Sequence, residues 1–114
     1  MTHPFHPGLW TDLYQLTMAQ GYFLSGRHEE RATFDYFFRK NPFKGGYVVF
    51  SGLEEALKLL LHPQPFDRES CEYLLEQGFH KDFVDYLSRF HFQGDLISAR
   101  EGEIIFPNEP MLSV

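Results

Sequence analysis

The chain has 114 residues, 43% hydrophobic and 18% aromatic, which are the proportions of a folded domain and not of a disordered segment. Its net charge of −6 argues against nonspecific binding to nucleic acid or to an anionic membrane surface, since both need a basic face. The single cysteine, Cys71, excludes an internal disulfide and a multi-cysteine zinc site, and no apolar run reaches the length of a membrane span. We therefore expect one domain in a reducing, cytoplasmic setting.

The first forty residues predict an arm, a helix and a strand. Residues 1–8, with two histidines, two prolines and a glycine, predict an extended arm. A mostly apolar helix is expected after Asp12, which has the spacing of a capping box with Gln15. Residues 31–39 alternate with a period of two, which predicts a strand with one buried face. That face would carry Ala32, Phe34, Tyr36 and Phe38.

The middle of the chain predicts a strand pair and another helix. Asn41-Pro42 and Gly45-Gly46 mark a loop, and the apolar run Tyr47 to Phe50 is expected to pair with the strand before it. Ser51 and Glu54 then form a second capping-box pattern, which predicts the start of a helix.

Two further helices and three short strands are expected in the second half. Asp67 would open one helix that ends at Gly78, and residues 81–90 would form the other. Their inward positions are predicted to be Cys71, Leu74, Leu75, Phe83, Val84 and Leu87. Short strands are expected over 95–99, 103–106 and 111–114. Because the chain stops at Val114 within an apolar pattern, we expect it to be the N-terminal portion of a longer protein.

A cationic cluster is the first candidate for chemistry. Arg39, Lys40 and Lys44 lie in the stretch RKNPFK, which is followed by two glycines. A strand end that leads into a glycine-containing loop offers cations and backbone N–H groups together, and this combination suits phosphate. The stretch matches neither a P-loop nor a dinucleotide fingerprint. Taken alone, the pattern favours a solvated hairpin turn with ordinary surface lysines.

Tyr14 is the second candidate. It falls in the first turn of the first predicted helix, near the partly positive end of the helix dipole, where its ring could lie beside an anionic, planar ligand. The alternative is packing against Trp10 and Met18, four residues to either side, and helical spacing alone favours this alternative.

The remaining reactive residue types suggest no catalytic centre. His3 and His6 are close in sequence, but they lie on the proline-rich arm without a third ligand, so no metal site is expected. Cys71 is expected to be a buried, inert thiol. No pair of carboxylates and no Ser/His/Asp pattern stands out.

Two segments resemble a known family. LWTDLYQLTMAQGYF (residues 9–23) and FDYFFRKNPFKGGYVVFSGLEEAL (residues 34–57) resemble the N-terminus of nicotinate phosphoribosyltransferase. The tail EGEIIFPNEPMLSV (residues 101–114) resembles the family's segment that leads toward its catalytic barrel. The T-D-x-Y block and the F-F-R-x-N-P-F-x-G-G-Y block together are specific motifs.

The resemblance implies a fold and an activity. The family has an N-terminal α+β domain, here residues 1–114, in which about four helices pack on a small mixed or antiparallel sheet beside an α/β barrel. It joins nicotinate to phosphoribosyl pyrophosphate with coupled ATP hydrolysis, which yields nicotinate mononucleotide and pyrophosphate for NAD salvage. This glycosyl transfer, classed with the ligases, takes place in cytoplasmic dimers whose site lies between one subunit's barrel and the other's N-terminal domain.

The resemblance also assigns residue roles. Tyr14 would stack on the pyridine ring, Arg39 would contact phosphate, and Asp12 would order the helix start. Further substrate-binding candidates are Lys40, Asn41 and Lys44. The family's phosphorylated histidine and its magnesium and ribose 5-phosphate sites lie beyond Val114. We therefore expect neither catalytic nor metal-binding residues in this chain, and we expect the chain alone to bind no ATP or magnesium and to be inert.

Two other interpretations stay open. The chain could be a stand-alone interaction or dimerisation domain that has the same fold without the chemistry and binds a partner through its phenylalanine-rich surface. The second interpretation is an enzyme of this kind that acts on nicotinamide, although the block F-R-K-N-P-F looks more like the nicotinate enzymes.

Overall fold

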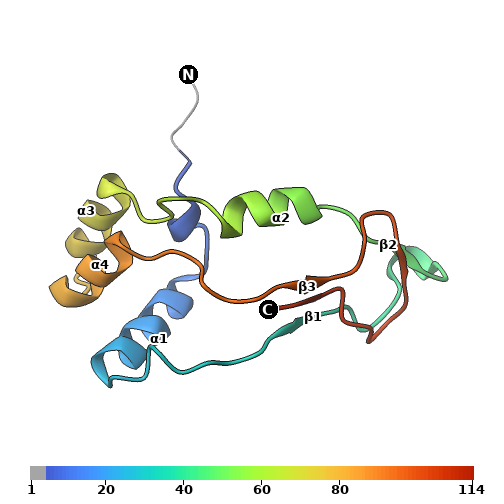
Figure 1. The fold of residues 1–114 in the computed structure, drawn as a ribbon, viewed down its shortest axis with the longest axis horizontal. Coiled ribbons are helices and arrows are strands. Elements are labelled where there is room, and N and C mark those ends of the chain that lie inside the picture. The colour runs from blue at the N-terminus through green and yellow to red at the C-terminus, as the bar shows by residue number, and fades with distance from the viewer. Residues whose placement is uncertain (1–4) are drawn as a thin grey trace. The chain divides into compact units, whose positions relative to one another are not determined.

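The computed structural model describes residues 5–114, and within them it confirms an α+β fold with four α-helices and short antiparallel strands. Figure 1 shows the fold, with the four α-helices and the first three strands labelled. In chain order, with η for a 3₁₀-helix, the elements are η1 (Pro7–Leu9), α1 (Leu13–Leu24), β1 (Asp35–Tyr36), η2 (Pro42–Lys44), β2 (Val48–Val49), α2 (Leu53–Leu60), α3 (Arg68–Glu76), α4 (Lys81–Ser88), β3 (Ile97–Ser98), β4 (Ile104–Ile105) and β5 (Leu112–Ser113). They form two compact units: a helical unit of residues 5–30 and 61–92, and a strand unit of residues 31–60 and 93–114. Among the described residues, no helix is long and apolar enough to cross a membrane.

The helical unit is held together by an apolar core to which α1, α3 and α4 contribute. Leu74 and Phe83 are each only 1% exposed, and burial of such a side chain stabilises the fold by about 1.5–3 kcal/mol. The inward positions predicted for α4 are confirmed, but Leu75 on α3 is exposed. Neighbouring helix residues point about 100° apart, so Leu74 and Leu75 do not both face one core. The core residues are Leu16, Phe66, Leu74, Phe79, Phe83, Val84 and Leu87.

The helices of this unit begin in different ways. As predicted, Asp67 caps α3, because its side chain accepts a hydrogen bond from the Ser70 N–H at 2.9 Å. The capping box predicted for α1 is wrong: the Asp12 side chain makes no capping hydrogen bond. The N–H of Gln15 donates instead to the main-chain carbonyl of Asp12 at 3.0 Å, so this donor is already satisfied without the carboxylate.

The expected extended arm is wrong for its described residues, 5–8. Residues 7–9 form η1, and the Gly8 N–H donates to the Pro65 carbonyl at 2.8 Å. A Cβ on Gly8 would lie 2.6 Å from that carbonyl oxygen and from the ring of Phe66, so only glycine permits this close approach. The segment is therefore fastened to the chain that leads into α3. Residues 1–4, which include His3, lie outside the described residues.

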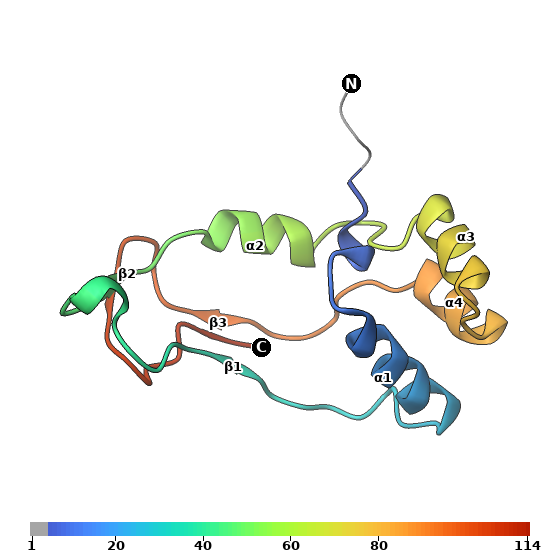
Figure 2. The same ribbon diagram turned by 180° about the vertical axis from the view of Figure 1, so that it is seen from behind.

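The strand unit contains two small antiparallel sheets. One has the order β1-β5-β3, and Figure 2 shows the C-terminal segment between the other two strands. The other pairs β2 with β4, with Val48 opposite Ile105. The predicted pairing of residues 47–50 with the preceding strand is therefore wrong. Between β1 and β2 the chain passes through η2 rather than a tight hairpin turn, and each strand takes its partner from the C-terminal segment.

The phenylalanine-rich strand does not bury the face that alternation predicts. Phe34 and Tyr36 are exposed, and Phe38 is only half-buried, packed against the second core of Phe50, Ile105 and Met111. Alternation puts these side chains on one face, but within the described chain no element covers the rings of Phe34 and Tyr36.

Helix α2 receives its cap from a distant residue. The Glu101 carboxylate accepts hydrogen bonds from the N–H groups of Gly52 at 2.7 Å and Leu53 at 3.0 Å. The capping box predicted from Ser51 and Glu54 is therefore wrong, and Glu54 pairs with Lys58 at 2.9 Å instead. A carboxylate from the C-terminal segment satisfies the free donors of the helix start and complements its dipole.

Candidate functional site

Tyr14 lies in the first turn of α1 with its side chain 57% exposed. Leu16 anchors the helix in the core, and Phe23 packs against the same core. Tyr14 and Met18 lie one turn apart on another face, and both are exposed. The ring of Tyr14 is thus presented at the surface of the helical unit, at the end of α1 where backbone N–H groups are free.

Asp12 and Trp10 precede this turn. Asp12 is the N-cap residue of α1 and is exposed, and it contributes to the helix start through its main-chain carbonyl. The Trp10 ring is exposed and meets the ring of Phe5 edge-on, with centroids 5.7 Å apart. The proposed packing partners of Tyr14 are therefore themselves exposed.

The cationic stretch forms the loop between β1 and β2. The backbone at the N-terminal end of the loop is fixed by a hydrogen bond from the Asn108 N–H to the Phe38 carbonyl, at 2.8 Å. Arg39 and Lys40 follow with exposed side chains, and half-buried Asn41 precedes η2. Within η2 the Gly45 N–H closes the turn onto the Pro42 carbonyl at 3.0 Å.

The positive charges of this loop have no carboxylate close to them in sequence. No Asp or Glu lies between Asp35 and Glu54, although the chain as a whole is acidic. Elsewhere four cations pair with carboxylates at 2.7–3.0 Å, namely Arg27, Lys58, Arg68 and Arg89. Among the described residues, none of the three loop cations forms an ion pair. Within the described residues the other three, Arg31, Lys81 and Arg100, form no ion pair either, but they are not clustered in sequence. The loop is therefore a local positive site that can attract an anion.

The tip of the loop is strained. Phe43 and Lys44 both have φ of +56°, in the left-handed region, and the Phe43 side chain is fully exposed. Such a conformation costs about 1 kcal/mol or more for each residue without a glycine's freedom. Gly45 and Gly46, which look like the flexible residues, do not have positive φ. The sequence contains no signal that would have placed the strain on the two residues before them.

The predicted site residues fall into two groups, each assembled within one unit. Asp12 and Tyr14 belong to the helical unit. The other four, Arg39, Lys40, Asn41 and Lys44, belong to the strand unit. Each group is contiguous in sequence, and for this reason motif reasoning could nominate it.

No metal centre or reactive thiol is built from the described residues. Residues 5–114 contain no group of three His, Cys, Asp or Glu side chains placed to hold a metal ion. Burial raises the pKa of the Cys71 thiol, and the nearby carboxylates of Asp67 and Asp85 raise it further. Its Sγ lies 3.7 Å from the Phe66 carbonyl oxygen, to which the thiol donates. The thiol is therefore kept protonated, although Cys71 is half-buried and not fully buried as the sequence predicts.

The fold and the two exposed groups define an α+β domain that presents an aromatic ring and a set of cations at its surface. The chain belongs to the nicotinate phosphoribosyltransferase N-terminal domain family, whose sequence model matches residues 9–114. The resemblance seen in the sequence motifs is thereby confirmed.

Individual relatives agree with this assignment. The chain is 45% identical over 106 residues to nicotinate phosphoribosyltransferase of Bacillus subtilis, covering 93% of this chain and 22% of that protein. It is 40% identical to nicotinate phosphoribosyltransferase 2 of Arabidopsis thaliana, covering 99% and 21%. The crystal structure of human nicotinic acid phosphoribosyltransferase superimposes with a TM-score of 0.79 at 31% identity, covering 92% and 22%. The chain thus spans about a fifth of the length of these relatives.

Proposed function

We propose that this chain serves as the N-terminal domain of an enzyme that joins nicotinate to phosphoribosyl pyrophosphate, with nicotinate mononucleotide and pyrophosphate as products. The family assignment and the 45% identity to the Bacillus subtilis relative support this proposal. The reaction would be coupled to ATP hydrolysis in the cytoplasm and would serve NAD salvage.

The observation that carries the proposal is the unpaired cationic loop. Phosphoribosyl pyrophosphate is rich in phosphate oxygens, and a guanidinium presents a planar fork of donors that matches them. Arg39 directly follows the strand end held by Asn108, so its backbone is fixed where the loop begins. We assign phosphate contact to Arg39, with weaker contributions from Lys40, Asn41 and Lys44.

Tyr14 would bind the nicotinate ring. An exposed aromatic face can stack on a pyridine ring, and the free N–H groups at the start of α1 favour the nearby negative charge of the nicotinate carboxylate. Asp12 would order this helix start through its main chain, since its side chain makes no capping hydrogen bond.

The remaining chemistry is assigned outside these residues. Because residues 5–114 provide no three-ligand cluster for a metal, we derive no step through magnesium or ATP on this chain. A barrel and a second subunit would supply those sites, with the active site shared in a homodimer. Mixing an Arg39→Ala enzyme with one inactivated in the barrel tests this sharing, because activity returns only if the two subunits complete one site.

A second candidate is a non-catalytic interaction domain of the same fold. The observation in its favour is the set of aromatic side chains that the strand unit leaves exposed, Phe34, Tyr36 and Phe43. An interaction domain would not support catalysis, whereas the enzyme domain would, so one experiment distinguishes the two functions.

The experiment is a chimera in which residues 9–114 replace the matching segment of the Bacillus subtilis relative. We expect the chimera to form nicotinate mononucleotide from nicotinate and phosphoribosyl pyrophosphate, and the 114-residue chain alone to form none. Circular dichroism and gel filtration establish that both proteins are folded. A folded chimera without activity would contradict the enzyme proposal and favour the interaction domain.

A further inference from the structure

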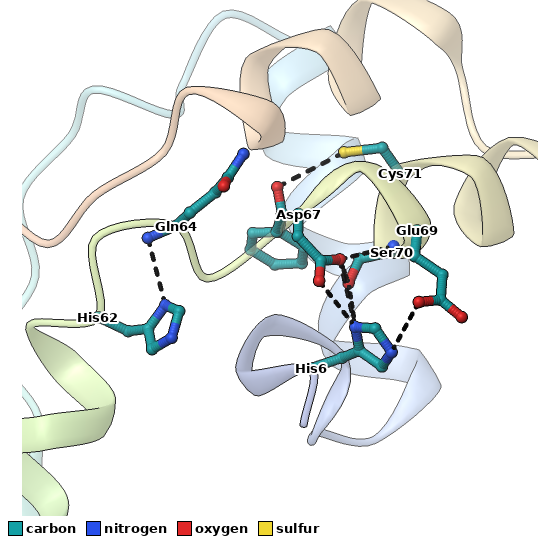
Figure 3. A network of polar contacts seen from close by, with 8 residues as sticks. His6, His62, Gln64, Asp67, Glu69, Ser70 and Cys71 are labelled. Carbon is teal, nitrogen blue, oxygen red and sulfur yellow. Dashed lines mark hydrogen bonds and ion pairs between the residues drawn. The ribbon is translucent and has the colours of Figure 1, made fainter. Parts of the chain in front are cut away.

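The ring of His6 lies against two carboxylates at the start of α3 (Figure 3). Its Nδ1 is 3.0 Å from Oδ2 of Asp67, and its Nε2 is 3.6 Å from Oε2 of Glu69. The His6 side chain is 20% exposed, whereas the side chains of Asp67 and Glu69 are 38% and 70% exposed. Both ring nitrogens therefore face negative charge.

The imidazolium fits this arrangement better than the neutral ring does. A neutral imidazole carries one N–H, and its other nitrogen presents a lone pair. With a carboxylate at each nitrogen, one contact of the neutral ring would set a lone pair against an anion. Only the imidazolium donates on both sides and brings a charge that opposes both carboxylates.

Ser70 fixes the Asp67 carboxylate for this contact. The hydroxyl and the N–H of Ser70 both donate to Oδ1 of Asp67, at 2.7 Å and 2.9 Å. Ser70 is fully buried, so its two hydrogen bonds fix the orientation of Asp67. His6 Nδ1 lies 3.0 Å from Oδ2, 3.2 Å from Oδ1 and 3.4 Å from the Ser70 Oγ. These Ser70 hydrogen bonds, with a smaller contribution from His6, hold the pKa of Asp67 below its ordinary value. Asp67 therefore stays ionised at mildly acidic pH.

The other charges on α3 do not compete for His6. Arg68 pairs with Glu72, with its Nε 2.7 Å from the carboxylate. Residues 5–9, which carry His6, contain no other charged side chain. The groups that set the charge of His6 within the described chain are therefore Asp67 and Glu69.

We propose that His6 is a pH-sensitive clamp, which in its protonated form fastens residues 5–9 to the start of α3 and which loosens as rising pH removes the second ring proton. Histidine is the side chain that ordinarily changes charge between pH 5 and 8. The clamp is independent of the proposed function, because it involves neither Tyr14 nor the cationic loop.

The Gly8 amide provides the test, because its hydrogen bond to the Pro65 carbonyl forms only while the segment is attached. We expect the hydrogen-exchange protection factor of Gly8 at pH 5.5 to be about fivefold higher in the unaltered chain than in the His6→Gln variant. At pH 8 the two should agree within about twofold. Glu69→Gln should give an intermediate loss at pH 5.5, because it removes one of the two charges.

A control and a second reporter complete the test. His62→Gln should leave Gly8 protection unchanged, since among residues 5–114 the His62 ring contacts neither carboxylate of the clamp and accepts a local hydrogen bond from the Gln64 N–H. Trp10, the single tryptophan, follows η1, and its fluorescence anisotropy should fall with rising pH in the unaltered chain but not in His6→Gln. Equal protection in both chains at pH 5.5, or a loss of the same size at pH 8, would overturn the proposal.

Discussion

At the scale of single residues, exposure is what distinguishes Tyr14. A helix with one buried stripe leaves its other faces to solvent, and α1 buries Leu16 while Tyr14 remains 57% exposed. A tyrosine that contributed only to packing would be buried, as Phe83 is on α4. The surface position of Tyr14 is therefore consistent with a ligand contact and inconsistent with a role in this chain's own core.

Replacement of Tyr14 should weaken nicotinate binding without unfolding the protein. In the chimera, we expect Tyr14→Ala to raise the KM for nicotinate by about fivefold through loss of the stacking face, while Tyr14→Phe retains most of the affinity. Tyr22→Ala is the matched control, because Tyr22 is exposed on the same helix two turns away. Equal effects of the two alanine variants on steady-state kinetics would remove Tyr14 from the site.

At the scale of elements, α2 depends on a contact that crosses 48 residues of sequence. The Glu101 carboxylate bridges the two N–H groups that open the helix, and the Gly102 N–H donates to the Phe50 carbonyl at 2.7 Å. The turn at residues 101–102 and the start of α2 therefore support each other, and the helix and the C-terminal strands should unfold together.

Loss of this cap should destabilise the chain. We expect Glu101→Ala to lower the free energy of unfolding by about 1 kcal/mol, the usual size of an N-terminal cap. Ser51→Ala should change the free energy of unfolding little, because Glu101, and not the Ser51 hydroxyl, caps the helix. Urea unfolding followed by circular dichroism measures both, and a larger loss in Ser51→Ala than in Glu101→Ala would contradict the observed cap.

At the scale of the whole molecule, the sequence predicts what is local and misses what is distant. The inward residues of α4 follow from a repeat within one helix, and the cations of the loop are neighbours in the chain. Tyr36 pairs with Leu112, and His6 meets Asp67 across 61 residues, and neither contact has a signature in the spacing of either segment. The exposure of Tyr36 was not predictable either. Alternation shows which side chains share a face of a strand, but it does not show whether another element covers that face.

The overall charge conceals the feature on which the proposed function rests. The chain carries a net charge of −6, yet the loop between Asp35 and Glu54 has three cations and no acid, and within the described residues these cations pair with no carboxylate. A local positive site on an acidic protein can bind phosphate without attracting polyanions to the whole surface.

The most direct test of this account is the steady-state kinetics of the chimera with Arg39→Ala. We expect the KM for phosphoribosyl pyrophosphate to rise by about tenfold or more, through loss of a charge-assisted hydrogen bond, with a smaller change in the KM for nicotinate. Arg31→Ala, an exposed arginine of the same strand unit, should leave both constants unchanged. Equal losses for both substrates, or the same effect from Arg31→Ala, would contradict the assignment of the loop as the phosphate-binding element.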